Sequence, residues 1–79
     1  MNIGKNIKDI PINKIYIGMK VIERESFGDY FHEVIFVQER PDTYHQLVLR
    51  GAGSCKNHIK VICHCGNLKD NFYFIESYE

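Results

Sequence analysis

Short apolar segments alternate along this chain with turn-forming residues, and no stretch shows a convincing amphipathic helix of ten residues or more. The segment "HIKVICHC" (58–65) shows the pattern most clearly, because its side chains alternate with a period of two. That period is typical of a strand with one buried face. Gly, Pro, Asp and Asn lie between the apolar segments, as expected of turns. The sequence therefore predicts five strands, within residues 12–24, 32–39, 46–50, 58–65 and 72–78.

The composition supports strands and bounds the size of the fold. Ile occurs 11 times and Ala once, and β-branched residues favour strands whereas Ala favours helices. A chain of 79 residues forms one domain with a small core. Rolling five short antiparallel strands into a barrel removes their exposed edges. We therefore expect an all-β domain over residues 15–79, a five-stranded, strongly bent antiparallel sheet or small barrel, after an irregular segment at residues 1–14.

The segment "IYIGMKV" (15–21) is similar to the opening of many SH3-like small barrels, where an apolar residue, a glycine and a valine lead into the first strand. On this mapping "ESFGDYF" (25–31) is the long first loop, and the resemblance covers about residues 15–76. The resemblance implies a fold only, because unrelated functions share small barrels.

The net charge is zero, but the charges form blocks. Residues 1–22 carry +3, residues 23–42 carry −4, residues 43–69 carry +4 and residues 70–79 carry −3. We expect these blocks to neutralise one another across neighbouring strands. The N-terminal residues lack the apolar region of a secretory signal, and no run has the length of a membrane helix. We therefore expect a cytoplasmic protein that does not bind membranes.

The segment 54–66 holds three cysteines and two histidines, which raises the question of a metal site or a redox site. If residues 58–65 form a strand, Cys63 and Cys65 share a face with Ile59 and Val61, and the histidines lie on the opposite face. We expect the face with the thiols to be the buried one, with Cys acting as a small hydrophobe. A disulfide between Cys63 and Cys65 is disfavoured by their spacing. We therefore expect no cofactor and no metal.

A zinc-stabilised fold is kept as an alternative. Its ligands would come from Cys55, His58, Cys63 and Cys65, although this spacing is not one of the usual zinc motifs. Cys55 follows a Gly-rich stretch and precedes Lys56. A neighbouring cation favours the thiolate, so a reactive thiol at Cys55 is kept as a further alternative.

Aromatic side chains near the expected turns indicate a binding surface. We predict a groove formed by Tyr30, Phe31 and Tyr44 and rimmed by Asp29 and Asp42. Such a surface suits a protein partner, and no catalytic motif points to an enzyme. A small strand-rich chain of this composition would suit a phage accessory protein, such as an inhibitor of a host defence enzyme.

Two further possibilities concern partners. Arg50, Lys56, Lys60 and Lys69 could bind single-stranded nucleic acid through the basic hairpin 50–60, although the pI near 6.9 is low for such a protein. An unpaired final strand could also join two copies of the chain edge to edge.

Overall fold

The computed structural model describes residues 1–40, 44–53, 57–65, 68 and 71–77. These residues form six strands and two short 3-10 helical turns, and no α-helix occurs among them. No helix in this part of the chain has the length and hydrophobicity needed to cross a bilayer. In chain order the elements are β1 (Asn2–Asn6), η1 (Ile7–Asp9), η2 (Ile12–Lys14), β2 (Lys20–Glu25), β3 (Gly28–Gln38), β4 (His45–Gly51), β5 (Ile59–His64) and β6 (Phe72–Ser77).

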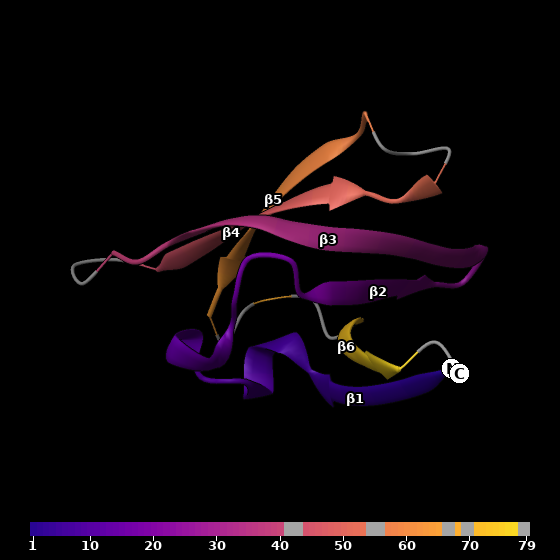
Figure 1. Ribbon diagram of the computed structural model, residues 1–79, viewed down its shortest axis with the longest axis horizontal. Coiled ribbons are helices and arrows are strands. Elements are labelled where there is room, and N and C mark those ends of the chain that lie inside the picture. The colour runs from indigo at the N-terminus through magenta and orange to yellow at the C-terminus, as the bar shows by residue number, and fades with distance from the viewer. Residues whose placement is uncertain (41–43, 54–56, 66–67, 69–70, 78–79) are drawn as a thin grey trace.

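The six strands form one antiparallel sheet in the order β1-β6-β2-β3-β4-β5 (Figure 1). Strands β2 to β5 make a meander in which each strand pairs with the next. The chain then returns, and β6 lies between β1 and β2. The prediction of an unpaired final strand is therefore wrong, because both sides of β6 are paired. The edge strands of the described sheet are β1 and β5.

The predicted class, a small all-β domain, is confirmed, but the strand count is six and not five. The additional strand is β1, from the segment expected to be irregular, and it pairs with β6 through two irregularities in register. Closure into a barrel is also wrong, because the sheet stays open between its two edge strands. Side chains and the 3-10 turns, rather than strand pairing, fill the space inside the curved sheet.

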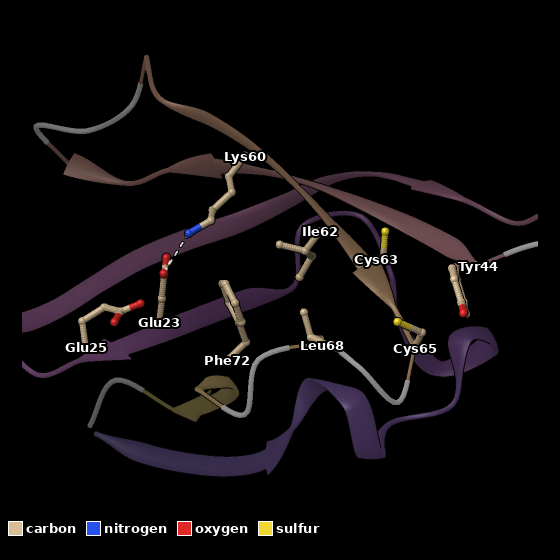
Figure 2. Close-up of a pocket in the computed structure, with 9 residues that line it drawn as sticks. All are labelled: Glu23, Glu25, Tyr44, Lys60, Ile62, Cys63, Cys65, Leu68 and Phe72. Atoms are coloured by element: carbon tan, nitrogen blue, oxygen red, sulfur yellow. Dashed lines mark hydrogen bonds and ion pairs between the residues drawn. The ribbon is translucent and has the colours of Figure 1, made fainter.

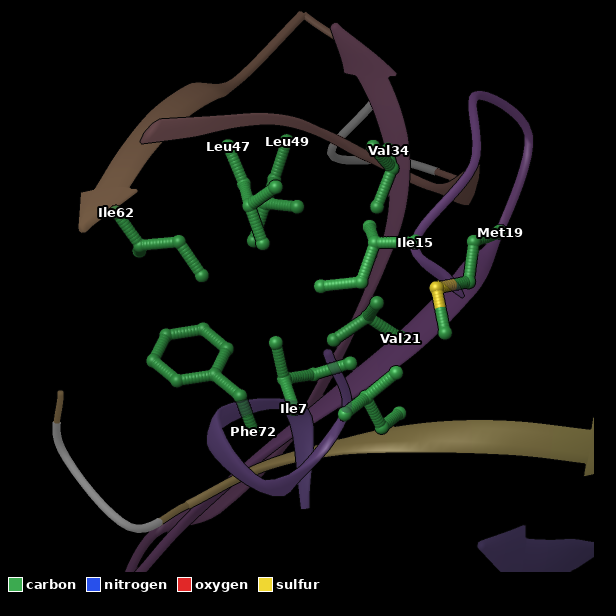
Figure 3. Close-up of a cluster of buried hydrophobic side chains, with 10 residues drawn as sticks. Ile7, Ile15, Met19, Val21, Val34, Leu47, Leu49, Ile62 and Phe72 are labelled. Carbon is green, nitrogen blue, oxygen red and sulfur yellow. The ribbon is translucent and has the colours of Figure 1, made fainter. Parts of the chain in front are cut away.

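The buried core lies on the concave side of the sheet (Figure 3). Strands β2 to β6 each contribute side chains to it, and η1 adds Ile7, which is fully buried. Because η1 closes one end of the curved sheet, the segment before β2 belongs to the packed fold. The members of the core are Ile7, Ile10, Ile15, Met19, Val21, Val34, Leu47, Leu49, Ile62 and Phe72.

Strand β5 is extended, as predicted, but its two faces are the reverse of those expected. Ile62 is buried in the core, whereas Ile59 and Val61 are more than half exposed and Cys63 is exposed. The reason is the register with β4, where Ile62 lies opposite the buried Leu47. A single isoleucine in phase with β4 therefore decides which face of β5 is inside, although more apolar residues lie on the other face.

His64 lies on the same face of β5 as the buried Ile62, and this position gives it a structural role. Its Nε2 atom lies 2.7 Å from the carbonyl oxygen of Ile10 and 3.1 Å from that of Ile7. A protonated Nε2 donates to both carbonyls, so the imidazole holds η1 against the edge strand. The expectation that both histidines point away from the core is thus wrong for His64.

The connection from β2 to β3 is a tight turn through Ser26 and Phe27, since Glu25 pairs directly with Gly28. The long first loop expected over residues 25–31 is therefore not found, and β3 runs for 11 residues instead. Pairing of polar residues across the hairpin explains the difference, because Arg24 and Asp29 lie opposite each other with 3.7 Å between Nε and Oδ1. Gly18 has a φ of 97° and lies in a turn that ends just before β2.

Candidate functional site

A pocket of about 520 Å³ opens at one end of the concave face, and we call it the mouth. It lies where β2 and β3 join and where β4 and β5 diverge from them. The tight turn after β2 forms its outer wall. Its lining residues are Glu23, Glu25, Phe27, Tyr30, Phe31, His32, Gly51, His58 and Lys60.

An aromatic pair forms the outer wall of the mouth. The rings of Phe27 and Tyr30 meet edge to face, with centroids 5.9 Å apart and an interplanar angle of 69°. Phe27 is 76% exposed and Tyr30 is 40% exposed. Folding therefore leaves much of this aromatic surface in contact with water, which is a cost that a binding partner would remove.

A buried network of charged and polar groups forms the base of the mouth. Glu23 is 6% exposed and His32 is 5% exposed, and Glu23 Oε1 lies 2.9 Å from His32 Nε2. Lys60 reaches from β5 to β2 and donates to Glu23 Oε2 at 2.8 Å (Figure 2). Its ammonium group also lies 5.3 Å from the centroid of the Phe72 ring, within the range of a cation–π contact. The network thus links the edge strand to the centre of the sheet.

Glu23 remains ionised in this setting. Burial raises the pKa of Glu23, but the hydrogen bonds from Lys60 and His32 outweigh burial and hold its pKa below the ordinary value of 4.5. A carboxylate only accepts hydrogen bonds, so Nε2 of His32 carries the proton that it shares with Glu23. The Nδ1 atom of His32 is buried and has no hydrogen-bond partner among the described residues. In a neutral imidazole this atom is an acceptor without a donor.

The strand period explains how polar side chains come to lie inside the sheet. Along β2, Glu23 follows Val21 on the same face, and along β3, His32 precedes Val34 on the same face. Val21 and Val34 are buried core residues, so the concave face changes from apolar to polar along these two strands. Along β5, Lys60 likewise lies two residues before the buried Ile62 and on the same face.

A second pocket of about 470 Å³ lies next to the mouth, along the gap between β5 and β6, and we call it the seam (Figure 2). Lys60 and Glu23 form the boundary between the two pockets. Cys63 and Cys65 lie at the far end of the seam. The seam is lined by Glu23, Glu25, Tyr44, Lys60, Ile62, Cys63, Cys65, Leu68 and Phe72.

The described residues contain no group of three or more His, Cys, Asp or Glu side chains that could hold a metal ion. Of the four zinc ligands considered from the sequence, His58 lines the mouth and Cys63 and Cys65 line the seam. Cys55 lies outside the described residues. Cys63 and Cys65 are both free thiols.

The predicted binding residues fall into separate places. Tyr30 and Phe31 both line the mouth, whereas Tyr44 lines the seam. Asp29 faces Arg24 across the hairpin and belongs to neither pocket. Asp42 lies outside the described residues. The structure therefore brings together two of the three predicted aromatic side chains.

The predicted basic surface is divided by ion pairs. Arg50 NH2 lies 3.4 Å from Glu33 Oε2, and Lys20 Nζ lies 3.0 Å from Glu33 Oε1, so three strands share one row of charges. The hydrogen bond from Lys20 is the main reason that the pKa of Glu33 lies below its usual value. Lys60 is paired with Glu23. These contacts confirm that charges of the first three blocks, residues 1–22, 23–42 and 43–69, neutralise one another across strands. Lys56 and Lys69 lie outside the described residues.

The mouth also contains residues that the sequence analysis did not select. Phe27, Glu23 and His32 are not among its predicted binding residues. One signal was present in the sequence, since Glu23 lies two residues after Val21 and His32 lies two residues before Val34. A polar residue in phase with core residues indicates a buried polar group.

Comparison of the chain with protein-family models, with curated proteins and with solved structures gave no match. The function is therefore argued from the chemistry of the mouth.

Proposed function

We propose that this protein is a non-enzymatic binding module that recognises a protein partner through the mouth. The observation that carries the proposal is the exposed edge-to-face pair of Phe27 and Tyr30 above a pocket with carboxylates at its base. Exposed aromatic side chains at the rim of a pocket are typical of the central residues of protein interfaces. A protein partner would cover both rings and place one anchoring side chain between them and the buried network.

The charges of the mouth favour a basic anchoring side chain. Glu23 and Glu25 both line it. Lys60 donates to Glu23, and Glu25 accepts a hydrogen bond from the uncharged amide of Asn71 at 2.8 Å. The aromatic pair offers ring faces to a cation, and such contacts contribute about 0.5–2 kcal/mol. An Arg or Lys side chain of the partner would therefore meet an aromatic wall and a carboxylate together.

The same contacts argue against catalysis. The two oxygens of Glu23 are already bonded to His32 and Lys60, so this carboxylate is not free to accept a proton from a substrate. Within the described residues, neither Cys63 nor Cys65 lines the mouth beside His32. In this part of the chain a general base such as His32 lacks a thiol nucleophile in the mouth, which suits binding better than acyl or phosphoryl transfer. A host enzyme whose surface the module covers would be a partner of this kind.

Selection from a random displayed peptide library against the immobilised protein tests the proposal. We expect the enriched peptides to share an Arg or Lys residue, and we expect replacement of that residue by a neutral side chain to abolish binding. The double variant Phe27→Ala/Tyr30→Ala should bind the same peptides at least about tenfold more weakly, because each ring contributes on the order of 1 kcal/mol.

Tyr16→Ala is the matched control, since Tyr16 is 54% exposed and lines neither the mouth nor the seam. This control should bind as the wild type does. Equal urea midpoints for the three proteins would show that the fold is intact. Peptides without a basic residue, or peptides that bind the double variant as tightly as the wild type, would contradict the proposal.

A further inference from the structure

Strand β5 has one side of its backbone that no described strand pairs with. Within the described part of the chain it pairs with β4 alone, over six residues without a register shift. Exposed strand edges of this kind pair readily with other strands, and proteins usually blunt them with charges, prolines or bulges. The other edge strand, β1, is blunted in this way, because its pairing with β6 is irregular in two places and it carries Lys5.

The register with β4 identifies which backbone groups are free. The amide of Gly51 donates to the carbonyl of His58 at 2.9 Å, so this pair is a hydrogen-bonded one. Hydrogen-bonded pairs alternate along an antiparallel ladder. The backbone N–H and C=O groups of Lys60 and Ile62 therefore point toward β4. The backbone groups of Ile59, Val61 and Cys63 therefore point to the open edge. The carbonyl of Cys63 already accepts from Cys65, at 3.1 Å.

The side chains of these three residues are uncharged and lie on the convex face. Val61 is 56% exposed and lies opposite Val48 of β4, which in turn lies opposite Phe36 of β3. Phe36 is 51% exposed. An apolar row thus crosses three strands and ends at the open edge, where nothing in the described chain covers it.

We propose that two copies of this chain form a two-fold symmetric dimer by antiparallel pairing of their β5 strands about Val61. In this register Val61 faces Val61 of the second copy, and the two residues exchange hydrogen bonds. Ile59 faces Cys63 of the second copy on each side of the axis. The apolar row of Phe36, Val48 and Val61 then continues into the same row of the other copy.

The charges near the edge suit this register. Ile59 lies at the end of a row formed with Arg50 and Glu33, and Cys63 lies at the end of a neutral row formed with Gln46. The two-fold axis therefore places the charged row of one copy against the neutral row of the other. No like charges meet across the axis, and like charges directly opposite would be destabilising.

The dimer is independent of the proposed function. It uses the open backbone edge and the convex face, whereas the mouth opens on the concave face. The mouth residues Phe27 and Tyr30 belong to the hairpin of β2 and β3, away from the edge. Dimerisation and peptide binding are therefore measured separately, and either proposal can be contradicted while the other stands.

Sedimentation velocity of the full chain between about 10 µM and 1 mM tests the proposal, because a small strand-edge interface is expected to give micromolar or weaker affinity. We expect the wild type to reach twice its monomer mass of 9.3 kDa. Val61→Lys should remain monomeric, since two ammonium groups would meet at the axis. Ile17→Lys, an equal change of charge at an exposed apolar position outside the strands, should still dimerise.

Amide exchange gives a second readout that does not depend on a variant. In the dimer the amides of Ile59, Val61 and Cys63 should become protected as the concentration rises, whereas those of Lys60 and Ile62 are protected at every concentration. A wild type that is monomeric at about 1 mM would overturn the proposal. A dimer that survives Val61→Lys, or amides at the open edge that stay unprotected in the dimer, would overturn it as well.

Discussion

At the scale of single residues, Glu23 is the group on which the mouth depends. It lies at a position that strand period assigns to the core, yet it is charged, and it is stabilised there by Lys60 and His32. A buried carboxylate is tolerated when its hydrogen bonds replace those lost from water. The sequence predicted neither this burial nor the network, because the partners come from β3 and β5 and meet only when the sheet curves.

The pKa of Glu23 gives the first prediction. Since its pKa is lower in the folded protein than the ordinary value of 4.5, its contribution to the free energy of unfolding is complete above about pH 4.5. That contribution is lost as the pH falls through the folded-state pKa. We expect Glu23→Gln to lower the free energy of unfolding at pH 7 by about 1–3 kcal/mol, because it leaves buried partners without a carboxylate.

Urea unfolding of the wild type and of Glu23→Gln between pH 7 and pH 3 measures this effect. The gap between the two proteins should narrow as the solution becomes more acidic, because protonated glutamate resembles glutamine. Glu39→Gln, at an exposed position, should follow the wild type at every pH. A gap that stays constant or widens toward low pH would show that Glu23 is not held in its charged form.

At the scale of elements, strand β5 shows how far periodicity can be trusted. The alternation in residues 58–65 correctly predicted an extended segment, but it did not show which face is buried. Ile59, Val61 and the two cysteines favoured one face, and the register with Leu47 of β4 selected the other. Register is a property of two strands, so one segment taken alone cannot supply it.

Two neighbouring substitutions to the same residue test the orientation of β5. Ile62→Thr should lower the free energy of unfolding by about 2–4 kcal/mol, because it removes buried methyl groups and places a hydroxyl in the core. Val61→Thr should change it by less than about 0.5 kcal/mol, because the site is exposed and threonine keeps β propensity. Urea unfolding of dilute protein measures both changes. If the two substitutions lower the free energy of unfolding equally, or if the one at position 61 lowers it more, the buried face of β5 is the other one.

At the scale of the whole molecule, the sequence predicted the class of the fold better than its closure. Alternating segments and turn residues correctly indicated a small antiparallel sheet, and the charge blocks correctly indicated cross-strand neutralisation between Lys20, Glu33 and Arg50. Strand β1 was missed because Gly4, Lys5 and Asn6 do not resemble a strand. The open edge was missed because closure of a barrel requires β5 to pair with β1, the other edge strand, and the pattern of single segments does not show whether two strands pair.

The mouth and the β5 edge both depend on one claim, that β5 turns Lys60 and Ile62 inward and leaves its odd-numbered side chains outside. If the strand were rotated by one residue, Lys60 would point away from Glu23 and the odd-numbered side chains would point inward. The exposed thiol of Cys63 reports the orientation directly, since a buried thiol reacts only when the protein opens.

The most direct measurement is therefore the rate at which Cys63 reacts with a small thiol reagent in the folded chain. Cys55→Ser and Cys65→Ser leave Cys63 as the single thiol, and Val61→Lys keeps the protein monomeric. We predict a rate within about tenfold of that of the same protein unfolded in urea, because the thiol is exposed without any opening of the fold. A rate slower by about a thousandfold, which rises as urea weakens the fold, would place Cys63 in the core and contradict this account.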